Sequence, residues 1–272
     1  MKNHCQVGNF ILSRKGDHMC RLLGIYGHVD FWKELSMGFR QLADTGRIPP
    51  EKYQTPGHKD GWGITMSNSE KSAMTAVMRQ LGSANDSSCY REAFESIETQ
   101  PHVVMCHLRK ASDNIPITLA NTHPFCWREW ALIHNGTVFN AEFLPRDPSL
   151  PITSDRSDTE YLFYYLMTQI SDKNTGKNRL EIITNAVRAI NVDFTSTNCL
   201  LSNGNELFVI RNYRKWDDYY SLYYYALPAG VIVCSEPLPS QYLSPERWQL
   251  LDNNIVAKIY GIPPKIEKLS VD

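Results

Sequence analysis

The order of apolar segments constrains the fold of this chain more than any other feature of its sequence. Short apolar runs of strand length fall into two groups, one ending near Asn135 and one beginning near Cys199. Two amphipathic helices are predicted between the groups. The first follows the capping-box pattern of residues 157–160, and the second carries its apolar face on residues 180–190. This order predicts two packed sheets covered by helices on both outer faces.

Local patterns predict the individual elements. The spacing of Phe31, Leu35, Phe39 and Leu42 indicates a helix that ends before Gly46, and a further helix is expected at residues 90–97. Asn203-Gly204 lies between two apolar runs and is the strongest hairpin signal of the chain. We expect strands directly after Cys20 and at residues 61–66, 103–108, 130–134, 199–201, 207–210, 222–227, 230–234 and 255–259.

Length and charge exclude several classes of protein. A chain of 272 residues with 42% hydrophobic content is expected to form one domain. The formal net charge of -1 argues against a nucleic-acid partner or an anionic membrane surface. No apolar run approaches the ~18 residues that span a bilayer. Seven cysteines form no even framework, which favours reduced thiols and a cytoplasmic location.

Cys20 is the candidate nucleophile of the chain, because it follows a possible start methionine. Removal of Met19 would leave a thiol and a free α-amine on one residue. An α-amine titrates near pKa ~7.7–8.0 and a thiol near ~8.5, so the amine can act as the base for the thiol. The competing interpretation is that Cys20 is an inert buried hydrophobe, as most cysteines are.

Other polar side chains stand beside predicted strands, and each has a structural interpretation. A histidine after a strand, such as His107 or His134, is more often structural than catalytic. Asn135-Gly136 could be a simple turn, and Asp158 is explained by helix capping alone. Taken singly, none of these residues predicts a site.

The order of these motifs resembles the class II glutamine amidotransferases of the N-terminal-nucleophile hydrolase superfamily. The resemblance extends from Met19 to Ile259 and is closest to the stand-alone, single-domain branch. It implies an α+β fold, a four-layer αββα sandwich with two antiparallel sheets between helical layers. The motifs that carry it are Cys20-Arg21-Leu22-Leu23-Gly24, Asp60-Gly61-Trp62-Gly63, His107-Leu108-Arg109, His123-Pro124-Phe125, His134-Asn135-Gly136 and Ser157-Asp158-Thr159-Glu160.

The resemblance implies hydrolysis of the side-chain amide of glutamine or a related γ-glutamyl amide, without a cofactor. Cys20 would attack the amide carbon, with its α-amine as base, and form a thioester that water then hydrolyses. Asn135 and Gly136 would stabilise the oxyanion through a side-chain NH2 and a backbone N–H.

The resemblance also implies how the amino-acid end of the substrate is recognised. Arg109 would bind the α-carboxylate and Asp158 the α-ammonium, while His107 would line the same pocket without a specified role. The partners expected are glutamine or a γ-glutamyl small molecule and an ammonia-accepting synthase in trans.

Two departures from the family pattern bear on this interpretation. Family members fused to synthases carry Arg-Gly-x-Asp before the second strand, whereas Gly57-His58-Lys59-Asp60 stands here. Residues 1–18 precede the expected amidotransferase type-2 domain of residues 19–272 and read as a leader, propeptide or misassigned start. If they were retained, the Cys20 amine would be lost in a peptide bond.

Two other functions compete with amide hydrolysis. A non-catalytic γ-glutamyl-binding or regulatory module would keep the pocket with a blocked N-terminus. A zinc site is the second alternative, but the spacing of the available ligands argues against it, since neighbouring strand residues point to opposite faces. Those ligands are Cys106, His107, His123, Cys126 and His134.

Overall fold

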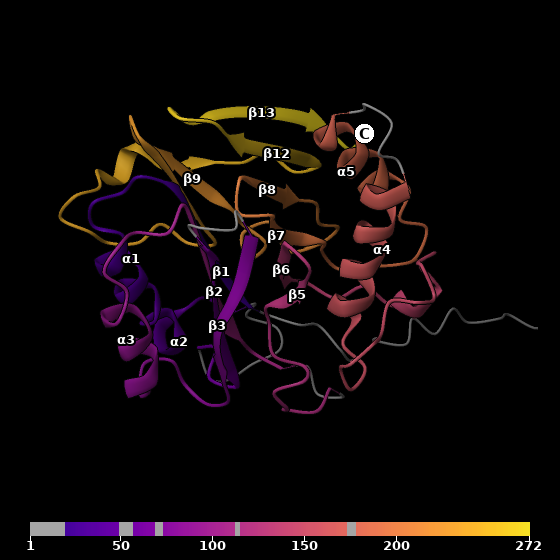
Figure 1. The fold of residues 1–272 in the computed structure, drawn as a ribbon, viewed down its shortest axis with the longest axis horizontal. Coiled ribbons are helices and arrows are strands. Elements are labelled where there is room, and N and C mark those ends of the chain that lie inside the picture. Colours follow the sequence, from indigo (N-terminus) through magenta and orange to yellow (C-terminus); the bar gives the residue numbers. More distant parts are fainter. Residues whose placement is uncertain (1–19, 49–56, 69–72, 112–114, 173–177) are drawn as a thin grey trace, which may run out of the picture.

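The computed structural model describes residues 20–48, 57–68, 73–111, 115–172 and 178–272. These residues form two antiparallel sheets that pack face to face (Figure 1). The first sheet has seven strands in the order β11-β9-β10-β1-β4-β2-β3. Its strands are β1 (Arg21–Gly27), β2 (Gly61–Asn68), β3 (Ala73–Gln80), β4 (Val103–Arg109), β9 (Tyr223–Ala226), β10 (Gly230–Cys234) and β11 (Gln249–Leu250).

The second sheet has six strands in the order β13-β12-β8-β7-β6-β5. Its strands are β5 (Phe125–Trp127), β6 (Trp130–Asn135), β7 (Asn198–Ser202), β8 (Glu206–Arg211), β12 (Ile255–Tyr260) and β13 (Lys265–Ser270). One short 3-10 helix, η1 (Ala141–Phe143), follows β6 of this sheet, and another, η2 (Pro245–Arg247), lies between β10 and β11 of the first sheet.

Helices cover the outer face of each sheet, which confirms the predicted four-layer sandwich. The helices α1 (Trp32–Phe39), α2 (Leu42–Thr45) and α3 (Ser88–Glu95) pack on the seven-stranded sheet. The long pair α4 (Asp158–Asp172) and α5 (Arg179–Arg188) packs on the six-stranded sheet (Figure 1). A third apolar cluster fills the space between the two sheets.

Strand β1 shows how the sequence places its side chains in two different layers. Leu23 and Ile25 join the cluster under the helices, whereas Leu22 and Tyr26 join the cluster between the sheets. Gly24 lets the facing sheet pack closely, because a Cβ atom there would lie 2.8 Å from Leu200 Cδ1 of that sheet. Cys20 precedes Arg21 and therefore lies on the face of β1 that meets the second sheet.

Most of the elements predicted from the sequence are confirmed, including the Asn203-Gly204 hairpin between β7 and β8. The single helix predicted to end before Gly46 is divided into α1 and α2, and the prediction missed the strands β3, β5, β11 and β13. The capping box predicted at residues 157–160 was wrong in its side-chain contact. The Glu160 carboxylate accepts from the backbone N–H groups of Thr153 and Ser154 and not from that of Ser157. The Ser157 N–H donates to Ser154 Oγ instead. The leader predicted at residues 1–18 lies outside the described residues.

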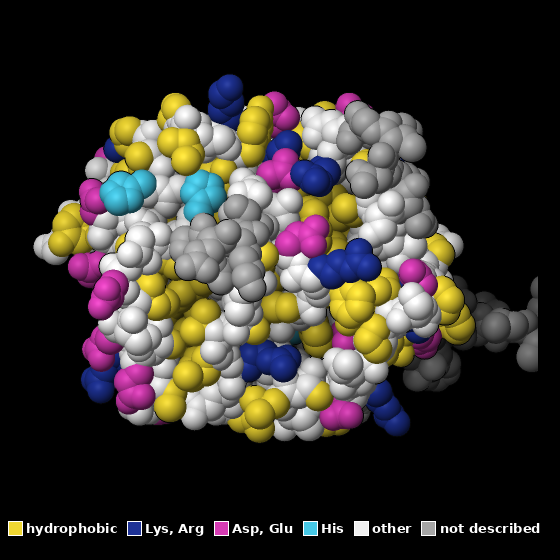
Figure 2. Space-filling model, in the orientation of Figure 1, with side chains coloured by type: hydrophobic (Ala, Val, Ile, Leu, Met, Phe, Trp, Pro, Cys, Tyr) yellow, Lys and Arg dark blue, Asp and Glu magenta, His cyan; other side chains and the backbone are white. Residues whose placement is uncertain are grey.

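The surface charges and the lengths of the helices agree with the near-neutral net charge and the short apolar runs of the sequence. Acidic and basic side chains are interspersed on the face that Figure 2 shows. Within the described ranges, none of the helices has the length and apolar content needed to cross a membrane.

Candidate active site

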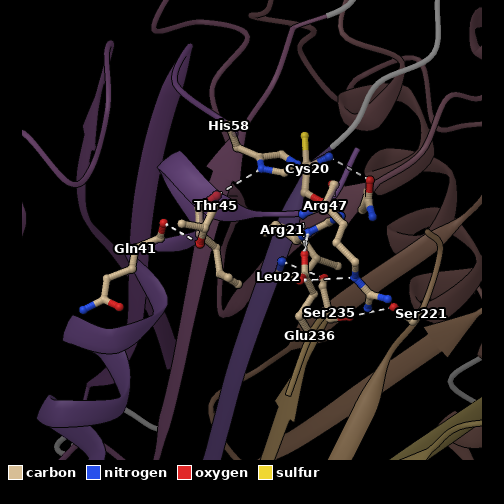
Figure 3. Close-up of polar contacts among 12 residues, drawn as sticks. Cys20, Arg21, Leu22, Gln41, Thr45, Arg47, His58, Ser221, Ser235 and Glu236 are labelled. Carbon is tan, nitrogen blue, oxygen red and sulfur yellow. Dashed lines mark hydrogen bonds and ion pairs between the residues drawn. The ribbon is translucent and has the colours of Figure 1, made fainter. Parts of the chain in front are cut away.

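Cys20 and Asn135 meet where the two sheets come together. Cys20 directly precedes β1 of the first sheet, and Asn135 is the last residue of β6 in the second. The Cys20 backbone N–H donates to Asn135 Oδ1 at 2.8 Å. Both residues are 1% exposed. Figure 3 shows the Cys20 thiol directed away from the strand that follows it. The structure thus brings together two residues that lie 115 positions apart in the sequence.

The orientation of the Asn135 amide leaves its donor group available. Because Oδ1 accepts from Cys20, the Nδ2 group points elsewhere, and it is buried without a hydrogen-bond partner among the described residues. A buried donor without an acceptor costs about 1–3 kcal/mol, so it is an energetically expensive feature. Such a group is suited to an oxygen atom that arrives with the substrate.

Gly136 follows Asn135 at a position where a side chain does not fit. A Cβ atom there would lie 2.0 Å from the Ser196 carbonyl oxygen and 2.9 Å from His134 Nε2. The absence of a side chain allows the Gly136 backbone to pass close to the backbone of Ser196. This packing fixes the direction of the backbone directly after Asn135.

His134 has a structural role that the hydrogen bonds define. Its Nε2 lies 3.0 Å from the Ser196 carbonyl, and its Nδ1 lies 2.9 Å from Thr159 Oγ1. A carbonyl only accepts, so Nε2 carries the proton and Nδ1 accepts from the threonine hydroxyl. The ring therefore ties the end of β6 to the start of α4, which agrees with the structural interpretation of a histidine after a strand.

Arg109 and Asp158 approach the same thiol from two different elements. Arg109 ends β4, and its Nη2 donates to the Pro116 carbonyl at 3.0 Å. Its Nη1 is buried and has no hydrogen-bond partner within the part of the chain that the structure describes. Asp158 begins α4 and accepts from the Val138 N–H at 2.7 Å through Oδ2. The Arg109 charge lowers the pKa of Cys20 and the Asp158 charge raises it, so both charges act on this thiol.

The Cys20 thiol is not activated by its surroundings alone. Burial raises its pKa to about 12, and a backbone hydrogen bond from Lys110 and the charges of Arg109 and Arg21 only partly oppose this effect. A thiol with such a pKa is protonated at neutral pH. This thiol could act as a nucleophile only beside a base that removes its proton.

Three further histidines from separate sequence motifs, His58, His107 and His123, are buried in the folded chain. The rings of His107 and His123 have centroids 4.1 Å apart. His58 is fully buried, and its Nδ1 lies 3.2 Å from the Leu42 carbonyl. Burial lowers the pKa of His58 well below its usual range, and the charges of Arg21, Lys110 and His107 add to this effect. These contacts give His107 a place near the site but define no chemical role for it.

The residues considered for zinc do not form a metal site. Cys106 joins the apolar cluster under the helices, while the neighbouring His107 packs on His123. Over the residues that the structure describes, no group of three or more His, Cys, Asp or Glu side chains is arranged to hold a metal ion.

Arg21 is a residue of the site to which the sequence motif assigned no role. Its side chain is fully buried, and its Nη1 donates to the Cys20 carbonyl at 3.0 Å. Its Nε donates to Glu236 Oε1 at 2.5 Å. The signal in the sequence is a charged residue at the start of an otherwise apolar strand, but its partner lies 215 positions away.

Known proteins resemble this chain in sequence and in fold. The sequence model of a family described as "Glutamine amidotransferases class-II" matches residues 19–225. Protein MJ1515 of Methanocaldococcus jannaschii, which is uncharacterized, is 29% identical over 202 residues, covering 72% of this chain and 52% of that protein. YafJ of Escherichia coli K12 is 28% identical over 159 residues, covering 57% of this chain and 56% of that protein. The chain thus spans about half the length of these curated relatives.

Solved structures share the fold at low identity. A class-II domain protein from Silicibacter pomeroyi, SPO2029, aligns with a TM-score of 0.59 and 16% identity over 92% of this chain and all of that chain. Glutamine phosphoribosylpyrophosphate amidotransferase from B. subtilis aligns with a TM-score of 0.61 and 17% identity over 93% of this chain and 49% of that chain. The four-layer arrangement is that of the N-terminal-nucleophile hydrolase fold, as the sequence predicted.

Proposed function

The chain belongs to the class II glutamine amidotransferase family, and we propose that it hydrolyses the side-chain amide of glutamine or a related γ-glutamyl amide. The hydrogen bond between Cys20 N and Asn135 Oδ1, which leaves Asn135 Nδ2 without a partner in the described structure, carries this proposal. The reaction uses side chains and backbone groups alone, without a cofactor. We assign it to the cytoplasm, where an unpaired nucleophilic thiol stays reduced.

The reaction begins with a proton transfer within one residue. The free α-amine of Cys20 takes the thiol proton as Sγ attacks the γ-carbonyl carbon, and the carbonyl oxygen becomes an oxyanion. Asn135 Nδ2 and the Gly136 N–H donate to that oxygen. The protonated amine then gives its proton to the leaving nitrogen, so ammonia or an amine departs and a thioester remains. Water, deprotonated by the same amine, hydrolyses the thioester to glutamate.

The raised pKa of Cys20 supports this role for the α-amine. A thiol that titrates at about 12 cannot supply a thiolate at neutral pH, so an adjacent base is needed. The mechanism requires Met19 and residues 1–18 to be absent from the active protein. We propose that the catalytic unit is the amidotransferase domain beginning at Cys20, with the preceding residues acting as a leader, propeptide or misassigned start.

Arg109 and Asp158 suit the amino-acid end of the substrate. Arg109 Nη1 is buried and, within the described residues, has no acceptor, so it can bind the α-carboxylate. The Asp158 carboxylate raises the pKa of Cys20, whereas Arg109 lowers it. This carboxylate can accept hydrogen bonds from the α-ammonium of the substrate. We propose that His107 lines the same pocket. The ammonia leaves to solvent or passes to a synthase in trans.

A non-catalytic γ-glutamyl-binding module remains the alternative function. It would keep the contacts of Arg109 and Asp158 but would hold Cys20 N as a peptide nitrogen without basicity. Intact-mass analysis that finds Cys20 N still in a peptide bond, together with ligand binding but no ammonia release by that protein, would favour this alternative.

The test is an ammonia-release screen over glutamine and γ-glutamyl amides with protein that begins at Met19 and has lost that methionine. Cys20→Ala should abolish release while substrate still binds, since only the nucleophile is removed. The control is Cys89→Ala, which removes a partly exposed cysteine of α3 and should keep full activity. Turnover that persists in Cys20→Ala would refute the assignment.

A further inference from the structure

Arg21 is a charged residue in a position that the fold reserves for apolar side chains. Along β1 it lies on the same face as Leu23 and Ile25, which pack under the helices, and it pairs in register with Leu108 of β4. Its side chain is nonetheless fully buried. Burying a charge is costly unless it is paired and hydrogen-bonded, so its contacts define what it does.

The guanidinium of Arg21 is held by several acceptors at once. Nε donates to Glu236 Oε1 at 2.5 Å, Nη1 donates to the Cys20 carbonyl at 3.0 Å, and Nη2 donates to the Arg47 carbonyl. The guanidinium carbon also lies 4.4 Å from the centroid of the Tyr219 ring. These groups fix the planar fork in one orientation (Figure 3).

Hydrogen bonds fix the position of both Glu236 and the residue before it. It accepts from the Arg47 N–H at 2.8 Å as well as from Arg21. The preceding residue, Ser235, exchanges two hydrogen bonds with Leu22, its Oγ accepting at 2.9 Å and its N–H donating at 3.0 Å. The segment after β10 is therefore bonded to Arg21 and to Leu22, the two residues that directly follow Cys20.

A nucleophile at the start of a chain needs such support. When no residue precedes it, Cys20 has no preceding peptide plane to restrain its rotation. Its main chain is then oriented by two contacts, from its nitrogen to Asn135 Oδ1 and from Arg21 Nη1 to its carbonyl oxygen. Loss of either contact frees rotations that move both the amine and the thiol.

We propose that Arg21, held by Glu236, is the positioning residue that orients Cys20, so that its α-amine faces Asn135 and its thiol faces the amide carbon; this inference rests on the proposed function. Arg21 contacts Cys20 through the carbonyl oxygen, its charge also lowers the pKa of the thiol, and it contacts no group assigned to the substrate. Its loss therefore affects the reacting geometry and leaves the recognition of the α-carboxylate and α-ammonium intact.

The test compares three variants in protein with a free Cys20 amine. In Arg21→Met/Glu236→Gln both charges are removed, so neither is left buried alone, and kcat should fall by about 10²-fold with KM unchanged. Arg21→Lys keeps the positive charge but loses the planar guanidinium and its fixed set of donors. Its kcat should lie between that of the double variant and that of the wild type. The matched control is Lys258→Met/Glu206→Gln, which removes both charges of an ion pair 2.7 Å long between β12 and β8 of the second sheet and should keep wild-type kcat.

A folded double variant with wild-type kcat, or with a change in KM alone, would overturn the inference. So would an equal loss of kcat in Lys258→Met/Glu206→Gln. Crystal structures of the wild type and the double variant give a readout that does not depend on turnover. The contact between Cys20 N and Asn135 Oδ1 should be lost or divided between conformers, and an unchanged contact would refute the positioning role. Absence of ammonia release by the wild type would instead refute the proposed function.

Discussion

Replacing Asn135 by aspartate separates the two tasks that the structure gives this side chain. Oδ1 accepts from Cys20 N, while Nδ2 is the candidate donor to the oxyanion. Asn135→Asp keeps an acceptor for the amine but replaces the donor by a second acceptor. Asn135→Ala removes both. If Asn135 only orients Cys20, the aspartate variant should be the more active of the two.

We expect the opposite result. Loss of one oxyanion donor lowers kcat by about 10²–10³, which corresponds to roughly 2.7–4 kcal/mol. The neutral hydrogen bond to Cys20 N contributes only about 1 kcal/mol, so the donor dominates the effect in Asn135→Ala. In Asn135→Asp the carboxylate also repels the oxyanion and, as an opposite charge, raises the pKa of the Cys20 ammonium, which reduces the free base at neutral pH.

The assay is steady-state ammonia release from the best γ-glutamyl substrate, with kcat and KM determined across pH. Asn135→Asp should lose at least as much kcat as Asn135→Ala, with little change in KM, and its acid limb should shift to higher pH. Unfolding midpoints of the variants control for loss of structure. Near-normal kcat in the aspartate variant, or an effect on KM alone, would refute the oxyanion role.

Three further predictions concern recognition, packing and pH. Arg109→Lys or Asp158→Asn should each cost about 2–5 kcal/mol in kcat/KM for glutamine, and equally for larger substrates with the same amino-acid head; unchanged kinetics would make them a structural arginine and a helix cap. Gly136→Ala should lower both kcat and the unfolding midpoint, because its Cβ would lie 2.0 Å from the Ser196 carbonyl; a fully active variant would contradict this packing. Burial keeps His58 neutral in the folded protein, whereas the unfolded chain binds a proton below pH 6.5, so the free energy of unfolding should decrease as pH falls through this range. Denaturant unfolding at pH 5 and pH 8 should show a smaller pH difference for His58→Gln than for the control His28→Gln at an exposed site; equal differences would argue against the effect.

The elements that the sequence predicted are those with a strong local pattern. β1, β4 and β10 are buried on both faces and read as continuous apolar runs. The missed strands lack this pattern: β13 is a largely exposed edge strand rich in charge, and β5 has only three residues. Such strands exist because a neighbouring strand offers its free edge, which is a tertiary effect that no local window contains.

The candidate site was predictable only in part, for a similar reason. The order of motifs predicted Cys20 and Asn135 as residues of one site, and the structure brings them into hydrogen-bond contact. The Ser157–Glu160 pattern located the start of α4, but the Asp158 carboxylate reaches across to Val138 N. Arg21 was visible as a charge in an apolar strand, but its task depends on Glu236, which sequence spacing cannot connect to it.

In the proposed mechanism the thiol and the free α-amine of Cys20 together form the catalytic group. Rapid acid quenching of the protein during turnover, followed by intact-mass analysis and peptide mapping, tests whether they do. Protein expressed from Met19 should lack that methionine and carry a glutamyl group on Cys20, whereas protein that retains residues 1–18 should carry none and release no ammonia. Equal acylation and turnover by the chain with residues 1–18 still attached would contradict the mechanism.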